Sequence, residues 1–265
     1  MMEGQGSTWR RANAAFAIAA MIFLLLPSLI VIPMSFSDSE LIIFPPKGYS
    51  FHLYQRYVEE PGWVSASILS LRVAIWTTIL SICLGVPAAY ALVRGNFPGR
   101  RMLAMFLLSP IMLPSVVLAL AIYIYFVRIS LSHGELRLVL AHCVATLPFV
   151  VVTAAAGIQT VDANIERAAT IMGASRLYVF RTVTLPLVIP SIVAGALFTF
   201  LISFDEIIIS IFVAKAGDTT LPIKMFSSLV FEVSPVLAAI STMLTLMSAL
   251  ICILVTFAQK GDAKP

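Results

Sequence analysis

Six long apolar stretches dominate this sequence, and they limit what the chain can fold into more than any other feature. They run approximately over residues 13–34, 64–92, 102–127, 137–157, 186–213 and 236–258. A bilayer-spanning helix needs about 20 mainly apolar residues. Backbone polar groups in lipid need partners within their own segment, so these stretches must be helical. We therefore predict an all-α, polytopic membrane bundle of about six transmembrane helices, forming a single domain over residues 1–265.

The composition excludes an ordinary soluble protein. Hydrophobic residues make up 60% of the chain and charged residues 11%, against roughly 25% charged in an average soluble domain. Lys and Arg set the orientation, because they are enriched in cytoplasmic loops. With the N-terminus inside, the inner segments hold ten of them and the outer segments six, namely Arg10, Arg11, Arg94, Arg100, Arg101, Arg167, Arg176, Arg181, Lys260 and Lys264 against Lys47, Arg56, Arg128, Arg137, Lys215 and Lys224. Both termini are therefore predicted to be cytoplasmic, with the lipid bilayer around the helices.

The sequence lacks the residues of several common chemistries. It has no G-x-x-x-x-G-K-[ST] phosphate loop, no Ser/His/Asp constellation and no His/Cys cluster with metal spacing. The net charge of +4 reflects the asymmetry between loops, since no basic, aromatic-interleaved surface for nucleic acid is available. We therefore expect no catalytic residue, metal site, cofactor or nucleic-acid partner in this chain. Any energy from hydrolysis must come from another subunit.

The polar loop 158–185, between two apolar stretches, carries an ordered pattern of helix caps and turns. Asp162 can cap a short helix by accepting hydrogen bonds from its first amides. Gly173 suits the left-handed residue that ends such a helix, and Ser175 can cap a second short helix. Pro186 then lies in the first turn of the next long helix. The pattern predicts a helix–glycine–helix element whose small residues let a partner approach closely; an ordinary basic loop is the alternative.

This loop resembles the EAA loop of permease subunits of binding-protein-dependent ABC importers. That family's pattern is E-A-A, three residues, Gly, nine residues and I-x-L-P. The residues in register are Ala168, Ala169, Gly173, Leu185 and Pro186, with Val183 in the isoleucine position and Ala174 beside the glycine. One departure is that Arg167 occupies the Glu position and Glu166 precedes it. Either Glu166 does the work of that glutamate from one residue earlier, or the contact is dispensable.

From about Trp63 to the C-terminus the chain is similar to spermidine/putrescine permeases, particularly through SFDEIIISIFV, TTLPIKMFSSL and VSPVLAAISTMLTL. The resemblance implies a type I ABC importer permease architecture in a bacterial inner membrane. It implies three protein partners: a dimer of ABC ATPase subunits that bind ATP and Mg, a second and different permease chain, and an external solute-binding protein. It also implies that residues 162–181 dock in an ATPase groove, and that the solute is a small cation such as putrescine or spermidine.

Three ionisable residues within the apolar stretches are candidates for the translocation pathway. Asp205 and Glu206 follow Pro186 by about 20 residues, or roughly 30 Å of helix, which places them toward the outer side. Charges within a span are costly and usually face a cavity or a partner. We expect one acid to face the pathway, while the other could pair with Arg72 or Lys215. The alternatives are a purely structural ion pair and, for Arg72, snorkelling to the interface.

Other functions also fit the sequence. Within the importer class, the solute could be an opine, an amino-acid derivative, thiamine or ferric iron, because permeases of this family often contribute little to selectivity. A proton-coupled secondary carrier is a further alternative, with Asp205 or Glu206 carrying the proton. No clear inverted repeat of half-helices is visible in the sequence, which counts against such a carrier.

Overall fold

The computed structural model describes residues 3–261, with side chains described for residues 9–10 and 13–250. Arg11, Lys260 and Lys264, which entered the prediction of orientation, therefore lie outside the described side chains. Across the described residues the regular structure is helical, apart from one isolated antiparallel bridge between Ser37 and Tyr49. This confirms the predicted all-α class. The chain divides into two compact units, residues 1–63 with 227–265, and residues 64–226.

Within the described residues, four helices are long and apolar enough to cross a membrane, or five if one bent pair counts as a single span. The four run over Asn13–Met34, Trp63–Arg94, Gly134–Thr160 and Arg176–Phe204. The last helix, α12, runs over Val236–Gly261, and the apolar helix within its described side chains, Val236–Leu250, is shorter than the other four. The described helices are thus long and apolar enough to cross a membrane several times, as the sequence predicts.

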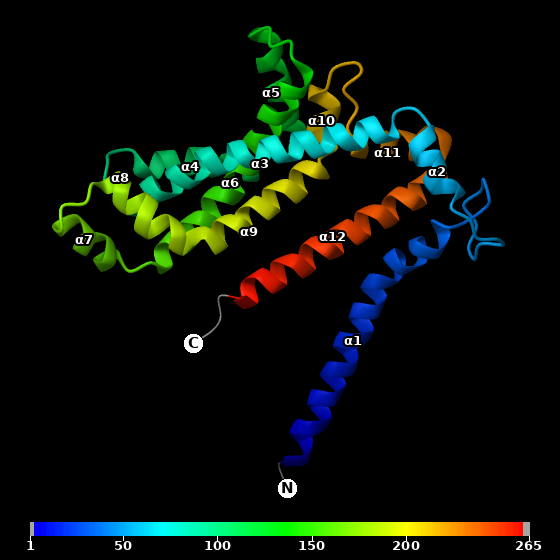
Figure 1. Ribbon diagram of the computed structural model, residues 1–265, viewed down its shortest axis with the longest axis horizontal. Helices are drawn as coiled ribbons and strands as arrows, with labels where there is room; N and C mark the ends of the chain where they lie inside the picture. Colours follow the sequence, from blue (N-terminus) through cyan, green and yellow to red (C-terminus); the bar gives the residue numbers. More distant parts are fainter. Residues whose placement is uncertain (1–2, 262–265) are drawn as a thin grey trace. The chain divides into compact units, whose positions relative to one another are not determined.

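The central element of the second unit is α6 (Gly134–Thr160). Its C-terminal half packs between α3 (Trp63–Arg94) and α9 (Leu185–Phe204) around a core of buried aliphatic residues. Figure 1 shows α3, α6 and α9 running side by side in this unit. The core residues are Val86, Ala89, Leu92, Val150, Val151, Ala154, Ile158, Val161 and Val188.

Two glycines allow α6 and α9 to approach closely. A methyl group on Gly157 would lie 2.4 Å from Ser191 Oγ, and one on Gly195 would lie 2.2 Å from Thr153 Oγ1. Helices in membranes commonly associate through such small residues, because close backbones maximise van der Waals contact. The α6–α9 contact is therefore a tight junction in which either glycine is hard to replace.

The predicted helix over residues 102–127 is broken into α4 (Arg100–Met112) and α5 (Ser115–Arg128), which are bent by 111°. Figure 1 shows α5 standing off steeply from α4. Pro110 lies in the last turn of α4 and Pro114 precedes α5. Proline lacks an amide donor and cannot continue a regular helix, so the two prolines explain the break. A second core joins α5 to α6 and to α10 (Ile208–Val213).

The first unit contains α1 (Glu3–Met34), α2 (His52–Glu59), the π-helical turn η2 (Ser228–Glu232) and α12. The boundary between the units falls within α11 (Leu221–Ser227), of which Ser227 alone belongs to the first unit. The loop that carries α2 is held by contacts among Phe36, Phe51 and Tyr54. Arg56 of α2 pairs with Glu40 and Glu60. These contacts give the 35–62 segment an ordered tertiary structure of its own.

Candidate functional site: a helix–glycine–helix element and a broken membrane helix

Residues 162–181 fold into the predicted helix–glycine–helix element. The first helix, α7 (Ala163–Ile171), is capped by Asp162, whose Oδ1 accepts a hydrogen bond from Asn164 N at 2.9 Å. Gly173 follows with φ of +90°, a region in which a residue with a Cβ costs about 1–2 kcal/mol. Ser175 Oγ then accepts from Tyr178 N at 3.3 Å and caps α8 (Arg176–Val179). Both caps and the glycine turn were predicted and are confirmed.

The connection to the next span is more direct than the sequence indicates. The second short helix does not end before Thr184; α8 passes through a π-helical turn, η1 (Phe180–Thr184), directly into α9. Together they form one helical run over Arg176–Phe204, and Figure 1 shows it as a continuous ribbon. Pro186 lies in the first turn of α9, where its missing amide is tolerated.

Glu166 anchors the element inside the chain. Its side chain is 11% exposed, and its Oε2 lies 3.1 Å from Nε of Arg94, itself 18% exposed at the end of α3. Its Oε1 accepts a hydrogen bond from Thr184 Oγ1 at 2.8 Å. Arg94 also donates to the carbonyls of Ile158 and Val161, at 3.0 and 2.6 Å. The Glu166 carboxylate thus ties α7 to α3 and η1, and Arg94 extends the link to the end of α6.

This geometry bears on the two alternatives for the motif glutamate. Glu166 is buried, whereas Arg167, which holds the motif position, is exposed. The carboxylate is therefore engaged within the chain and is not presented on the surface of α7. Arg94 and Thr184 are functional candidates that the sequence did not reveal, because Arg94 is 72 residues from its partner.

The exposed surface of the helix–glycine–helix element combines apolar and basic side chains. Ile171 is 86% exposed and Met172 82% exposed, and Ile165, Leu177 and Tyr178 are exposed as well. Among the small residues, Ala168 is exposed, whereas Ala169 and Ala174 are half-buried. Leu185 packs against the α3–α6–α9 core, and Pro186 is exposed. Large apolar side chains on a loop between spans are unusual unless a partner covers them.

The span predicted over residues 186–213 is interrupted at the two acids. α9 ends before Asp205, and α10 begins only at Ile208. The prediction that both carboxylates lie on one regular helix was therefore wrong. Glu206 Oε1 accepts a hydrogen bond from Ile209 N at 2.9 Å, and this local bond competes with helix continuation. Asp205 is exposed at this bend, and Glu206 is half-buried.

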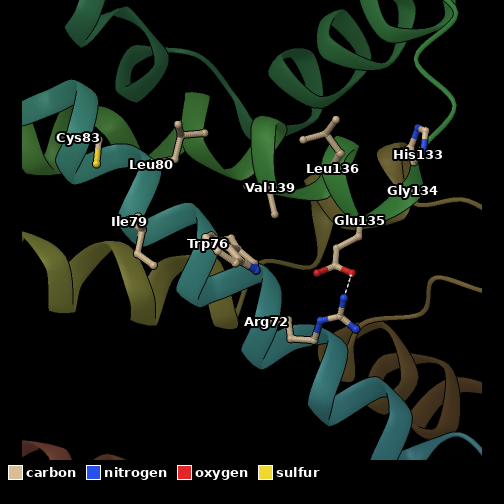
Figure 2. Close-up of a pocket in the computed structure, with 10 residues that line it drawn as sticks. All are labelled: Arg72, Trp76, Ile79, Leu80, Cys83, His133, Gly134, Glu135, Leu136 and Val139. Carbon is tan, nitrogen blue, oxygen red and sulfur yellow. Dashed lines mark hydrogen bonds and ion pairs between the residues drawn. The ribbon is translucent and has the colours of Figure 1, made fainter.

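Arg72 lies within the predicted span, on α3, but has a different partner from the one predicted. Figure 2 shows it on α3 pointing toward Glu135 of α6. Arg72 Nη2 lies 2.6 Å from Glu135 Oε2. Both residues of the pair line an open pocket of about 730 Å³. The rest of the lining is mainly apolar, comprising Trp76, Ile79, Leu80, Cys83, His133, Gly134, Leu136 and Val139. The pairing of Arg72 with one of the acids at 205 and 206 was wrong.

His142 is a further buried polar group that joins α6 to both sides of the bend. Its ring nitrogens lie 2.9 Å from the hydroxyls of Ser203 and Ser210. The sequence gives only a lone histidine in an apolar stretch, which is typical of an ordinary core residue. Among the described residues, no group of three His, Cys, Asp or Glu side chains is arranged to hold a metal ion.

Comparison with known proteins identifies the class to which this fold and its membrane helices belong. Residues 81–261 match the family described as "Binding-protein-dependent transport system inner membrane component". The chain belongs to this family: it is a non-catalytic, multi-pass permease subunit of an ABC importer. Membership implies partnership with an ATPase and with a solute-binding protein.

Individual relatives share most of the chain. It is 32% identical over 245 residues to the putrescine transport system permease protein PotI of Escherichia coli strain K12, covering 90% of this chain and 86% of the relative. It is 30% identical over 240 residues to the spermidine/putrescine transport system permease protein PotC of Haemophilus influenzae, covering 91% and 93%. The resemblance to polyamine permeases is thereby confirmed.

Solved structures support the fold. A subunit of a bacterial ABC transporter involved in the import of the acidic polysaccharide alginate superposes with a TM-score of 0.74 at 14% identity, covering 100% of this chain and 99% of that chain. A chain of the inward-facing MetNI methionine transporter gives a TM-score of 0.62 at 16% identity, covering 76% and 96%. At these identities the likeness establishes the architecture alone.

Proposed function

We propose that this chain forms half of the translocation pathway of an ATP-driven importer for small cationic solutes of the polyamine class. The observation that carries the solute class is identity of 32% and 30%, over 90% and 91% of the chain, to permeases named for putrescine and spermidine. Asp205 supports it, because an exposed carboxylate at a break in a membrane helix attracts cations and marks a pathway.

In this proposal the helix–glycine–helix element is the docking surface for an ATPase subunit that binds ATP and Mg. Its two short helices are capped and joined by a glycine of fixed conformation, so the surface is preorganised. The exposed side chains of Ile171 and Met172 supply apolar area that fits the groove of a soluble partner. The small side chains of Ala168 and Ala169 let the partner approach the neighbouring backbone closely, and Arg167 contributes a positive charge.

Movement of the ATPase subunits would reach the pathway through α9. The run from Arg176 to Phe204 has 29 residues, or roughly 40 Å at helical rise. It begins in the docking surface and ends beside Asp205. The ion pair of Glu166 with Arg94 adds a connection to α3. A displacement of the element would therefore tilt α9 and α3 together and switch access to the pathway.

The same proposal assigns the orientation and the remaining partners. Both termini and the helix–glycine–helix element lie in the cytoplasm of a bacterium, on the side with the larger share of Lys and Arg. The bend at Asp205 then lies toward the outer side, where an external binding protein delivers the solute. A second, different permease chain supplies the other half of the pathway.

Uptake of labelled putrescine and spermidine by cells with and without the gene tests this function. The deletion strain is expected to lose uptake that depends on ATP and survives an uncoupler of the proton gradient. Uptake that collapses with the uncoupler alone would indicate a proton-coupled carrier instead. Unchanged polyamine uptake on deletion would discard the polyamine assignment, and uptake of opines, amino-acid derivatives, thiamine and ferric iron would be measured next.

A further inference from the structure

The imidazole of His142 bridges the break between α9 and α10, where Asp205 and Glu206 lie. The residue lies in the N-terminal half of α6 and is 1% exposed. Its Nδ1 lies 2.9 Å from Oγ of Ser203, in the last turn of α9, and its Nε2 lies 2.9 Å from Oγ of Ser210, in α10. One ring therefore contacts the helix before the bend and the helix after it.

Each ring nitrogen has a serine hydroxyl as its hydrogen-bond partner, and Ser210 Oγ also lies 2.8 Å from the carbonyl oxygen of Glu206. A hydroxyl can both donate and accept, so a neutral imidazole in either tautomer is bonded on both sides. The bridge therefore does not depend on which ring nitrogen carries the proton.

The segment held by this bridge carries the exposed carboxylate. Asp205 and Glu206 lie between the two serines, and Glu206 is itself engaged at the start of α10 through Ile209 N. Both sides of the bend pack on α6, and α10 packs in addition on α5. The His142 ring is a buried polar link from α6 to each side of the bend.

We propose that His142 is a positioning residue for solute transfer: by bridging Ser203 and Ser210 it fixes the bend and hence the direction of the Asp205 carboxylate. This inference rests on the proposed role of Asp205 as a cation-attracting group of the pathway. A histidine that served only the packing of the core would affect the amount of folded protein, but not the affinity for the solute.

The experiment measures initial rates of labelled putrescine uptake in proteoliposomes that contain the complete importer. The variants are His142→Ala, Asp205→Asn and their combination. If the ring positions the carboxylate, each single variant raises KM about fivefold to tenfold while the maximal rate per transporter stays within about twofold of the unmodified protein. The double variant should be no worse than Asp205→Asn alone, because the positioned group is already lost.

Two further variants keep the test decisive. Ser210→Ala removes one hydroxyl of the bridge and should raise KM about threefold even if His142→Ala fails to assemble. Thr77→Val is the matched control, since it removes another buried hydroxyl, bonded to Val139 O at 3.4 Å, away from the bend. Its KM should not change.

The outcomes separate the two proposals. An unchanged KM in both His142→Ala and Ser210→Ala, with a raised KM in Asp205→Asn, overturns the positioning role and leaves the pathway acid intact. Multiplication of the two effects in the double variant overturns it as well. An unchanged KM in Asp205→Asn refutes the pathway role of Asp205. It also removes the basis of the positioning role of His142, which depends on that carboxylate.

Discussion

Replacing Glu166 by alanine should release the helix–glycine–helix element from the ends of α3 and η1. The variant loses the ion pair with Arg94 and the hydrogen bond from Thr184. Breaking a buried ion pair by removing one partner costs about 3–5 kcal/mol. Arg94 keeps its bonds to two carbonyls, so the lower end applies. A loss of about 3 kcal/mol raises the population of the detached element roughly a hundredfold.

Hydrogen–deuterium exchange of the assembled permease measures this loss directly. Amides of α7 and η1 should exchange about a hundredfold faster in Glu166→Ala, and transport per ATP hydrolysed should fall because movement of α7 is no longer passed to α3 and η1. Glu166→Gln keeps the shape and neutral hydrogen bonds, so its loss should be about 1 kcal/mol, or roughly fivefold.

Asp162→Ala is the control within the same helix. It removes a cap worth about 1 kcal/mol, and its effect should be confined to α7, because Asp162 does not bond to η1. Wild-type protection of both α7 and η1 in Glu166→Ala would refute the reasoning, since it would mean that the buried pair contributes nothing to anchoring the element.

Three further perturbations probe the docking surface, the bend and the helix junction. Gly173→Trp should assemble in the membrane but lose uptake almost completely, whereas Gly217→Trp, which has the same left-handed strain and an equally open position, should transport normally; equal uptake by both would sink the docking role. Asp205→Asn should lower uptake at low cation concentration while the amount of protein stays normal. Glu206→Gln, which weakens the start of α10, should mainly lower thermal stability. If the two effects were exchanged, Glu206 would be the pathway acid and Asp205 the structural one. Gly157→Val should lower the free energy of unfolding by about 1–3 kcal/mol through overpacking, measured as a lower melting temperature. An unchanged melting temperature would mean that α6 and α9 separate easily.

Local chemistry made the helix–glycine–helix element predictable from the sequence. Asp162 and Ser175 bond to amides two and three residues away, and Gly173 adopts the conformation that its missing Cβ allows. These interactions are encoded within a few residues. The apolar stretches were predictable for a related reason, because length and hydrophobicity alone decide whether a segment can cross a bilayer.

The parts that the sequence did not predict depend on distant residues or on competition between weak local preferences. The inward turn of Glu166 needs Arg94, from another helix. The bend after Asp205 reflects the capping bond of Glu206, which competes with a helix that the surrounding apolar residues would otherwise continue. Arg72 meets Glu135 only because α3 and α6 are neighbours, and no periodicity within either segment encodes that pairing.

The burial of Glu166 also sets the electrostatic character of the proposed docking surface. With that carboxylate neutralised by Arg94, residues 162–181 retain one free acid, Asp162, against the exposed Arg167, Arg176 and Arg181, a balance of +2 (three minus one). Complementary charge mainly accelerates encounter, and salt weakens it. Association with an ATPase subunit should therefore slow as ionic strength rises, while dissociation, governed by the apolar contacts of Ile171 and Met172, stays nearly constant.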